Sequence, residues 1–144
     1  IDYTIQSSRL AALYEKFKTV EYPTVIAESN SMGEPIIDQL RRDGIGVRAF
    51  MTTNQSKARI IERLQIAFER SEIQIIDNAI LANELMAFEA TPLLTGTRYA
   101  APSGMHDDTV MALAIAWQGR QDSEGGWAAF ADMGHVDGVE RPWE

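Results

Sequence analysis

The 144-residue chain contains no cysteine, which excludes both a disulfide framework and a thiolate metal site. Any bound metal ion must therefore take its ligands from oxygen atoms or imidazole rings, and zinc-finger folds are excluded. Long hydrophobic runs are missing as well, since the longest spans about a dozen residues and a membrane-spanning helix needs about 20. No basic segment followed by an apolar one opens the chain. We therefore expect a soluble, intracellular protein with no membrane partner.

Positive charge is scarce, because 13 lysine and arginine residues face 21 aspartate and glutamate residues and give a net charge of −8. This balance argues against a domain that binds nucleic acid by neutralising many phosphates with its own side chains. Binding of nucleic acid would need help from divalent cations or from another domain or subunit. Acidity alone is most often only a solubility feature, so the charge does not decide between these functions.

Hydrophobic residues make up 45% of the chain, which is enough for the core of one domain. Short apolar runs typical of strands alternate with segments whose apolar residues recur every three or four positions, as in helices. We expect strands at residues 1–5, 24–28, 45–51, 73–76 and 98–101, and helices at 7–18, 35–44, 57–70, 78–89 and 107–117. This order predicts an α/β domain over residues 1–120, followed by a C-terminal tail at 121–144 that glycine and proline interrupt.

Two adjacent carboxylates, Asp107 and Asp108, open an otherwise apolar helix. One of them would suffice to cap the helix and to favour the positive end of its dipole, so the second needs another explanation. A carboxylate at the start of a buried helix can instead bind Mg²⁺ or Mn²⁺, which prefer oxygen ligands. From the helix alone, the cap and the metal site are equally well supported.

Glu28 is a further unusual acid, because it closes the apolar run of the predicted strand 24–28. In open α/β sheets ligands gather where the strands end, although a carboxylate there can also be an ordinary ion-pair partner. Glu28 and the Asp107–Asp108 pair can face the same edge of such a sheet. Two divalent ions about 3.5–4 Å apart can activate a water molecule and stabilise the leaving oxygen of a phosphodiester, but they need several carboxylates. Three acids are marginal for two ions.

Other polar residues near these acids are candidates for accessory roles. Lys57 lies in the first turn of a predicted helix, where a cation opposes the helix dipole, so we expect it to contact a phosphate or a site carboxylate. Asn30 lies in the turn after Glu28, and His106 precedes the paired aspartates, where a structural role is favoured over metal binding. Glu84, within a predicted helix, is expected to be an ordinary surface charge.

Four motifs in this order carry a resemblance to a known family. They are residues 25–33 (VIAESNSMG), 52–57 (TTNQSK), 84–88 (ELMAF) and 104–114 (GMHDDTVMALA). Each motif alone is weak, but their order and spacing resemble the C-terminal nuclease domain of the large terminase subunit of tailed bacteriophages and prophages. The resemblance covers roughly Tyr3 to Trp117.

The resemblance implies a ribonuclease H-like fold, with a mixed central sheet flanked by helices. It also implies a two-metal endonuclease that uses Mg²⁺ or Mn²⁺ to cut double-stranded DNA during viral packaging in the cytoplasm of a bacterial host. The implied partners are an upstream ATPase motor domain, the portal and the small terminase subunit. By the match, Glu28 corresponds to the second acid of the family, and the Asp107–Asp108 pair to the third.

The chain departs from the family at its first acid, which lies on an early strand that precedes a hairpin. No such strand is found, and Asp2 is a poor substitute because it lies only 26 positions before Glu28. We therefore expect a domain that is incomplete at its N-terminus, whose DNA cleavage is weak or absent. The sheet edge that this would expose suggests self-association.

Two alternatives remain open. Another ribonuclease H-like nuclease, such as a junction resolvase, would share the acids but prefer branched DNA. A non-catalytic assembly module would use the acids only to cap helices and to pair with Arg48, Lys57 or Arg98. A phosphate-binding enzyme that uses the turn near Gly33 is less well supported, because this turn lacks the spacing and the lysine of a P-loop.

Overall fold

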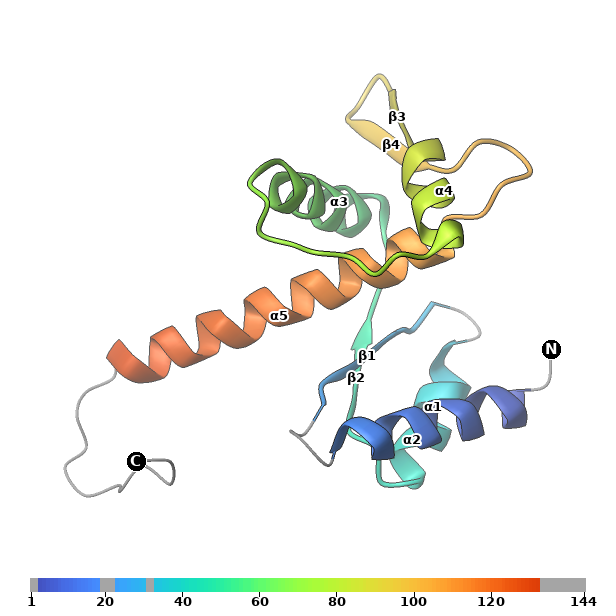
Figure 1. Ribbon diagram of the computed structural model, residues 1–144, viewed down its shortest axis with the longest axis vertical. Helices are drawn as coiled ribbons and strands as arrows, with labels where there is room; N and C mark the ends of the chain where they lie inside the picture. Colours follow the sequence, from blue (N-terminus) through green and yellow to red (C-terminus); the bar gives the residue numbers. More distant parts are fainter. Residues whose placement is uncertain (1–2, 19–22, 31–32, 133–144) are drawn as a thin grey trace.

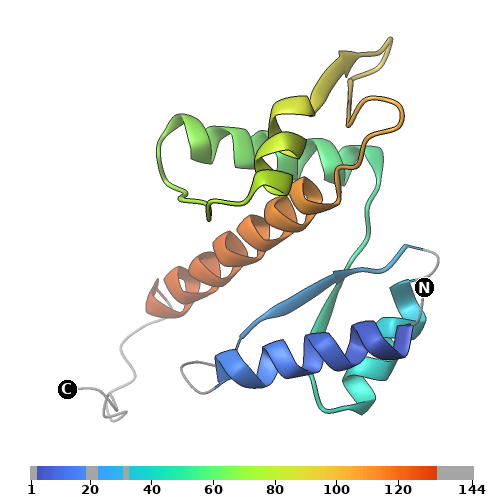
Figure 2. The same ribbon diagram turned by 45° about the vertical axis from the view of Figure 1, so that its right-hand side comes forward.

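The computed structural model describes residues 3–18, 23–30 and 33–132, and its elements form two groups joined by one long helix (Figure 1). The first group contains α1 (Tyr3–Lys18), β1 (Val25–Glu28), α2 (Gly33–Arg42) and β2 (Val47–Phe50). The second contains α3 (Asn54–Glu69), α4 (Ala79–Ala87), β3 (Glu89–Pro92) and β4 (Thr97–Ala100). Helix α5 (Asp108–Asp132) packs on α3 and α4 and also reaches β1. Both views place β1 and β2 between α5 and the pair α1 and α2 (Figure 2).

Strands β1 and β2 are parallel and are connected through α2, as the predicted strand–helix–strand order requires. Helix α2 ends at Arg42, and the turn after it contains Gly44, where the sequence predicts the end of the helix; its φ of 83° is a left-handed conformation that favours glycine. The amide of Ile45 then donates to the carbonyl of Leu40 at 3.0 Å, which closes the helix end. Strand β2 begins directly after this turn. Because β1 and β2 are parallel and Glu28 pairs with Phe50, the ends of the two strands lie side by side.

The buried side chains form two clusters, one on each side of β1. The larger lies between α3 and α5 and contains Ile60, Ile61, Leu64, Ala67, Val110, Met111, Ala114, Ile115 and Trp117. The smaller lies against α2 and contains Ile37, Leu40, Ile45 and Val47. Because successive side chains of a strand point to opposite faces, Ile26 packs on the larger cluster while Val25 and Ala27 pack on the smaller. Strand β1 therefore connects the two groups of elements and carries Glu28 at its end.

The five predicted helices and three of the five predicted strands, those at 24–28, 45–51 and 98–101, are confirmed, and the fold is α/β as expected. The strand predicted at residues 1–5 is wrong, since Tyr3 to Ile5 already belong to α1; Ile1 and Asp2 lie outside the described residues. The strand predicted at 73–76 does not form either: this segment has no ladder partner in the described chain, and Ile76 is 75% exposed. Short alternating runs become strands only when a neighbouring strand pairs with them.

Three further expectations need correction. Residues 91–97, between the predicted helix 78–89 and the predicted strand 98–101, are expected to form neither helix nor strand, but they contain the end of β3, which pairs antiparallel with β4. Helix α5 does not end near Trp117 but continues to Asp132 through Gly119, Gly125 and Gly126, because a glycine weakens a helix by only about 1 kcal/mol. In place of one mixed central sheet, the described residues form two separate two-stranded sheets.

None of the helices described is long and apolar enough to cross a membrane.

Candidate active site

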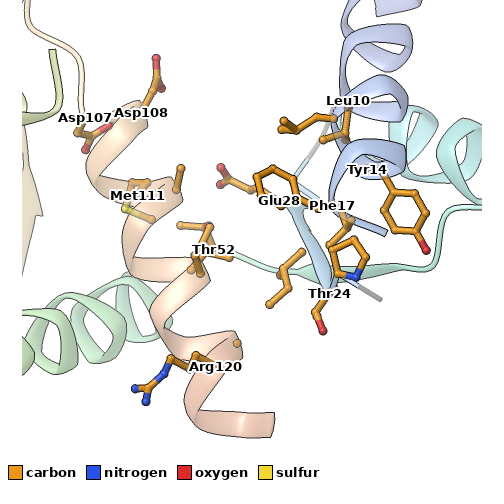
Figure 3. A pocket seen from close by; sticks show the side chains of 18 of the residues that line it. Leu10, Tyr14, Phe17, Thr24, Glu28, Thr52, Asp107, Asp108, Met111 and Arg120 are labelled. Atoms are coloured by element: carbon orange, nitrogen blue, oxygen red, sulfur yellow. The ribbon is translucent and has the colours of Figure 1, made fainter. Parts of the chain in front are cut away.

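A cleft of about 710 Å³ lies between α5 on one side and α1 and β1 on the other. Its polar lining residues include Glu28 from β1, Lys57 from α3 and the Asp107–Asp108 pair at the start of α5. Figure 3 shows the Glu28 carboxylate directed from β1 toward α5, with Asp107 and Asp108 at the first turn of that helix. The acids singled out in the sequence therefore line one cleft, although they come from different elements.

The position of Glu28 is fixed by bonds just beyond its strand. The amide of Ser29 donates to the carbonyl of Phe50 at 2.9 Å, which extends the pairing of β1 with β2 by one step. The side chain of Asn30 then donates to the carbonyl of Thr52 at 2.7 Å and accepts from its amide at 2.8 Å. Asn30 thus holds the two strand ends together, and its role in the structure is to keep Glu28 at the edge of the cleft.

Lys57 makes the carboxylate contact that its place in the helix suggests. Its ammonium lies 2.7 Å from Oδ2 of Asp107, and the two side chains are only 21% and 26% exposed. Helix α3 begins with a capping box between Thr53 and Ser56, which sets the first turn that carries Lys57. The ammonium also lies 5.7 Å from the centre of the Phe88 ring. A partly buried pair of this kind is screened less by salt than an exposed one.

Glu84 is not the surface charge that we expect from the sequence, because it is only 8% exposed. Its Oε2 accepts a hydrogen bond from the amide of Thr109 at 2.8 Å and from the hydroxyl of the same residue at 2.5 Å. The Thr109 hydroxyl lowers the pKa of the Glu84 carboxyl, and burial acts in the opposite direction. The sequence signal for this burial is that Glu84 is the single charged residue of a mostly apolar helix, α4.

The remaining candidates lie outside the cleft or at its margin. His106 Nδ1 is 3.9 Å from Oδ2 of Asp108, and both side chains are more than 80% exposed, at 82% and 87%. Arg48 pairs with Asp122 at 3.1 Å rather than with a cleft acid. Within the described residues Glu28 has no ion-pair partner, in contrast to Asp107. The pairing expected for an assembly module therefore holds for one acid of the three.

The chemistry of the cleft fits an oxygen-preferring divalent cation, since its acidic side chains offer carboxylate oxygens and no thiolate. A neutral oxygen ligand is available as well: the buried hydroxyl of Thr52 also lines the cleft, and it has no hydrogen-bond partner in the part of the chain described. However, no three acidic or histidine side chains of the described residues lie close enough together to hold a metal ion. The acids share a cleft without converging on one point.

Known proteins resemble the chain in sequence and in structure, although no family model matches it. The terminase large subunits of Thermus phage G20c and of Thermus virus P23-45 are each 26% identical to it over 122 residues. The crystal structure of the large terminase nuclease from thermophilic phage G20c superposes with a TM-score of 0.72 at 25% identity, over 82% of the chain. The chain resembles a large-terminase nuclease in both sequence and fold. This likeness supports a nuclease role.

The same nuclease has been solved with bound metal ions. The structure with cobalt gives a TM-score of 0.71 at 26% identity, and the structure with magnesium gives 0.67 at 24% identity. The match covers 83% of the present chain but 24% of the whole large subunits, and 62% of the solved nuclease. The resemblance to the terminase nuclease expected from the four sequence motifs is therefore confirmed, over a part of the relatives' length.

Proposed function

We propose that the chain is a metal-dependent nuclease domain of the terminase type, with a ribonuclease H-like fold, which hydrolyses phosphodiesters of double-stranded DNA. The observation that carries the proposal is the shared cleft of Glu28, Asp107 and Asp108, three acids from two elements that the rest of the fold holds at its edge. The terminase nuclease of phage G20c, whose structure the chain resembles, has been solved with bound magnesium and with bound cobalt. The same proposal assigns residues 1–120 to the nuclease domain.

The three carboxylates would hold Mg²⁺ or Mn²⁺, which in a two-metal site supplies an activated water molecule and stabilises the leaving oxygen. Glu28 lies at the strand end and the aspartates at the helix start, so a cation would be bound from two sides once these acids are drawn together around it. Lys57 competes with that cation for Asp107. Because the chain carries a net charge of −8, the cations would also reduce the repulsion between the cleft and the DNA phosphates.

In the intact assembly, this domain would act together with the motor domain of the large subunit, the portal and the small subunit. Strong DNA binding would then come from those partners and from the cations, because acidic residues outnumber basic ones in the chain, 21 to 13. The cleft acids would contribute the cutting chemistry. A junction resolvase would differ in cutting branched DNA in preference to linear duplex.

Titration with Mn²⁺ tests the metal site directly. Glu28→Gln and Asp108→Asn are each expected to lower the affinity for Mn²⁺ at least about tenfold, because each removes a charged oxygen ligand. Calorimetry measures the affinity, and nicking of supercoiled DNA in Mn²⁺ measures activity. Glu69→Gln is the matched control, since Glu69 is exposed on α3, outside the cleft, and bonds to Gln65. If all variants bind Mn²⁺ and cut DNA equally, the assignment is wrong.

Lys57→Met is expected to act in the opposite direction. Removing the ammonium frees Asp107 and removes a positive charge from the cation site, so the affinity for Mn²⁺ should rise about three- to tenfold. The same titration measures this, and circular dichroism checks that the fold is retained. Lys18→Met, which removes an exposed lysine paired with Glu15, should leave the affinity unchanged. An unchanged affinity in Lys57→Met would mean that the ion pair only joins α3 to α5.

A further inference from the structure

Helix α5 begins with two carboxylates, yet neither caps it. Asp107 is the residue before the first helical one, and its carbonyl accepts the first helical hydrogen bond, from Met111 at 2.9 Å. A side chain at this position normally accepts from the amide two or three residues later, which in α5 is Thr109 or Val110. The amide of Thr109 is already taken by Glu84, at 2.8 Å. The carboxylate of Asp107 turns instead to Lys57 in the cleft.

We infer that Glu84 is a positioning residue of the metal site: by capping α5 from α4, it leaves the carboxylate of Asp107 available to the cleft. This inference rests on the proposed function, because it assigns Glu84 a role in cation binding through Asp107. Glu84 is not itself a ligand in this arrangement, since it does not line the cleft. From the sequence, the paired acids could serve either as a cap or as ligands. With Glu84 in the capping role, Asp107 is left to serve as a ligand.

The surroundings of Glu84 are suited to such a role. A carboxylate that is only 8% exposed must be satisfied by hydrogen bonds, and Thr109 supplies two of them to the same oxygen. The far end of α4 is fixed separately, since the side chain of Asn78 accepts from the amides of Ile80 and Leu81 at 3.0 Å each. This cap is local to α4, whereas the bonds of Glu84 reach the first turn of α5.

A purely structural cap and a positioning residue differ in what their loss changes. Loss of a structural cap lowers the stability but leaves the cation affinity of the folded protein unchanged. Loss of a residue that orients ligands lowers the affinity itself, and outer partners of metal ligands typically account for about 10- to 100-fold. Stability and affinity must therefore be measured separately on each variant.

The test compares Glu84→Gln with the wild-type chain by calorimetric titration with Mn²⁺, at a temperature where both are folded. We expect the affinity to fall about tenfold. Thr109→Val, which removes the donor hydroxyl, should also lower the Mn²⁺ affinity. Thr109→Ser keeps the hydroxyl and should retain the wild-type affinity. Asn78→Ala is the matched control, since it removes the cap of α4 and should lower stability without changing the affinity.

The outcomes separate this inference from the proposed function. An unchanged affinity in Glu84→Gln, with a loss in Asp107→Asn, would overturn the positioning role and leave the metal site in place. An unchanged affinity in Asp107→Asn would contradict the metal site itself. If Glu84→Gln does not fold, the comparison of Thr109→Val with Thr109→Ser decides, because equal affinities in these two would likewise overturn the inference. In an Asp107→Asn background, Glu84→Gln should cause little further loss.

Discussion

Shortening Ile60 to alanine is expected to lower the free energy of unfolding by about 2–5 kcal/mol. Ile60 is fully buried, at 0% exposure, in the cluster between α3 and α5. It lies one turn from Lys57 on the same helix, so the contacts that it makes with α5 also set the approach of Lys57 to Asp107. The substitution removes three carbon atoms and leaves a cavity that the surrounding helices can fill only in part.

Urea unfolding followed by circular dichroism measures this loss. Ile66→Ala is the matched control, because it makes the same chemical change on the same helix at a side chain that is 43% exposed. Its cost should be about 1 kcal/mol or less, since little apolar surface is returned to water. Equal losses in the two variants would mean that α3 does not pack on α5 through the face that contains Ile60.

The elements that the sequence predicts well are those whose signals are local. Asn78 caps α4 and Gly44 ends α2, as their residue types indicate, because caps and left-handed turns depend on a few neighbouring residues. The strands predicted at 1–5 and 73–76 fail for the opposite reason. A strand needs a partner elsewhere in the chain, and an alternating run such as that around Ile75 carries no information on whether one is present.

The site residues also differ in whether their roles depend on local signals or on partners elsewhere in the chain. The unfavourable dipole position of Lys57 is visible in the sequence, so the need for a carboxylate partner could be predicted, although not which one. The burial of Glu84 could not be predicted from the sequence, because it follows from the packing of α4 on α5 and from the bond to Thr109, 25 positions away. Sequence reasoning also places Glu28 and the aspartates at one edge but gives no distances, and the described acids do not converge.

Gly119→Val is expected to separate the two sides of the cleft. A Cβ atom at this position of α5 would collide with the end of the Ile26 side chain on β1. Because Ile26 lies two residues before Glu28, and α5 carries Asp107 and Asp108, this close approach helps to set the spacing of the three acids. We expect the larger side chain to lower the free energy of unfolding by about 1–3 kcal/mol, the usual cost of overpacking. The Mn²⁺ affinity should fall with it, about tenfold, since ligands from the two sides could then not be drawn together around one ion.

Urea unfolding and Mn²⁺ titration of the same samples measure both effects. Gly46→Val is the matched control, because no atom lies within 4 Å of a Cβ added there and the residue is exposed. Gly119→Ala should be milder, since only the flexible end of Ile26 must move and alanine favours the helix by about 1 kcal/mol. Shortening the opposing side chain in a Gly119→Val, Ile26→Ala double variant should recover part of the affinity, because the space then returns. If Gly119→Val is as stable as the wild-type chain and binds Mn²⁺ as tightly, β1 and α5 do not set the distance between Glu28 and the paired aspartates.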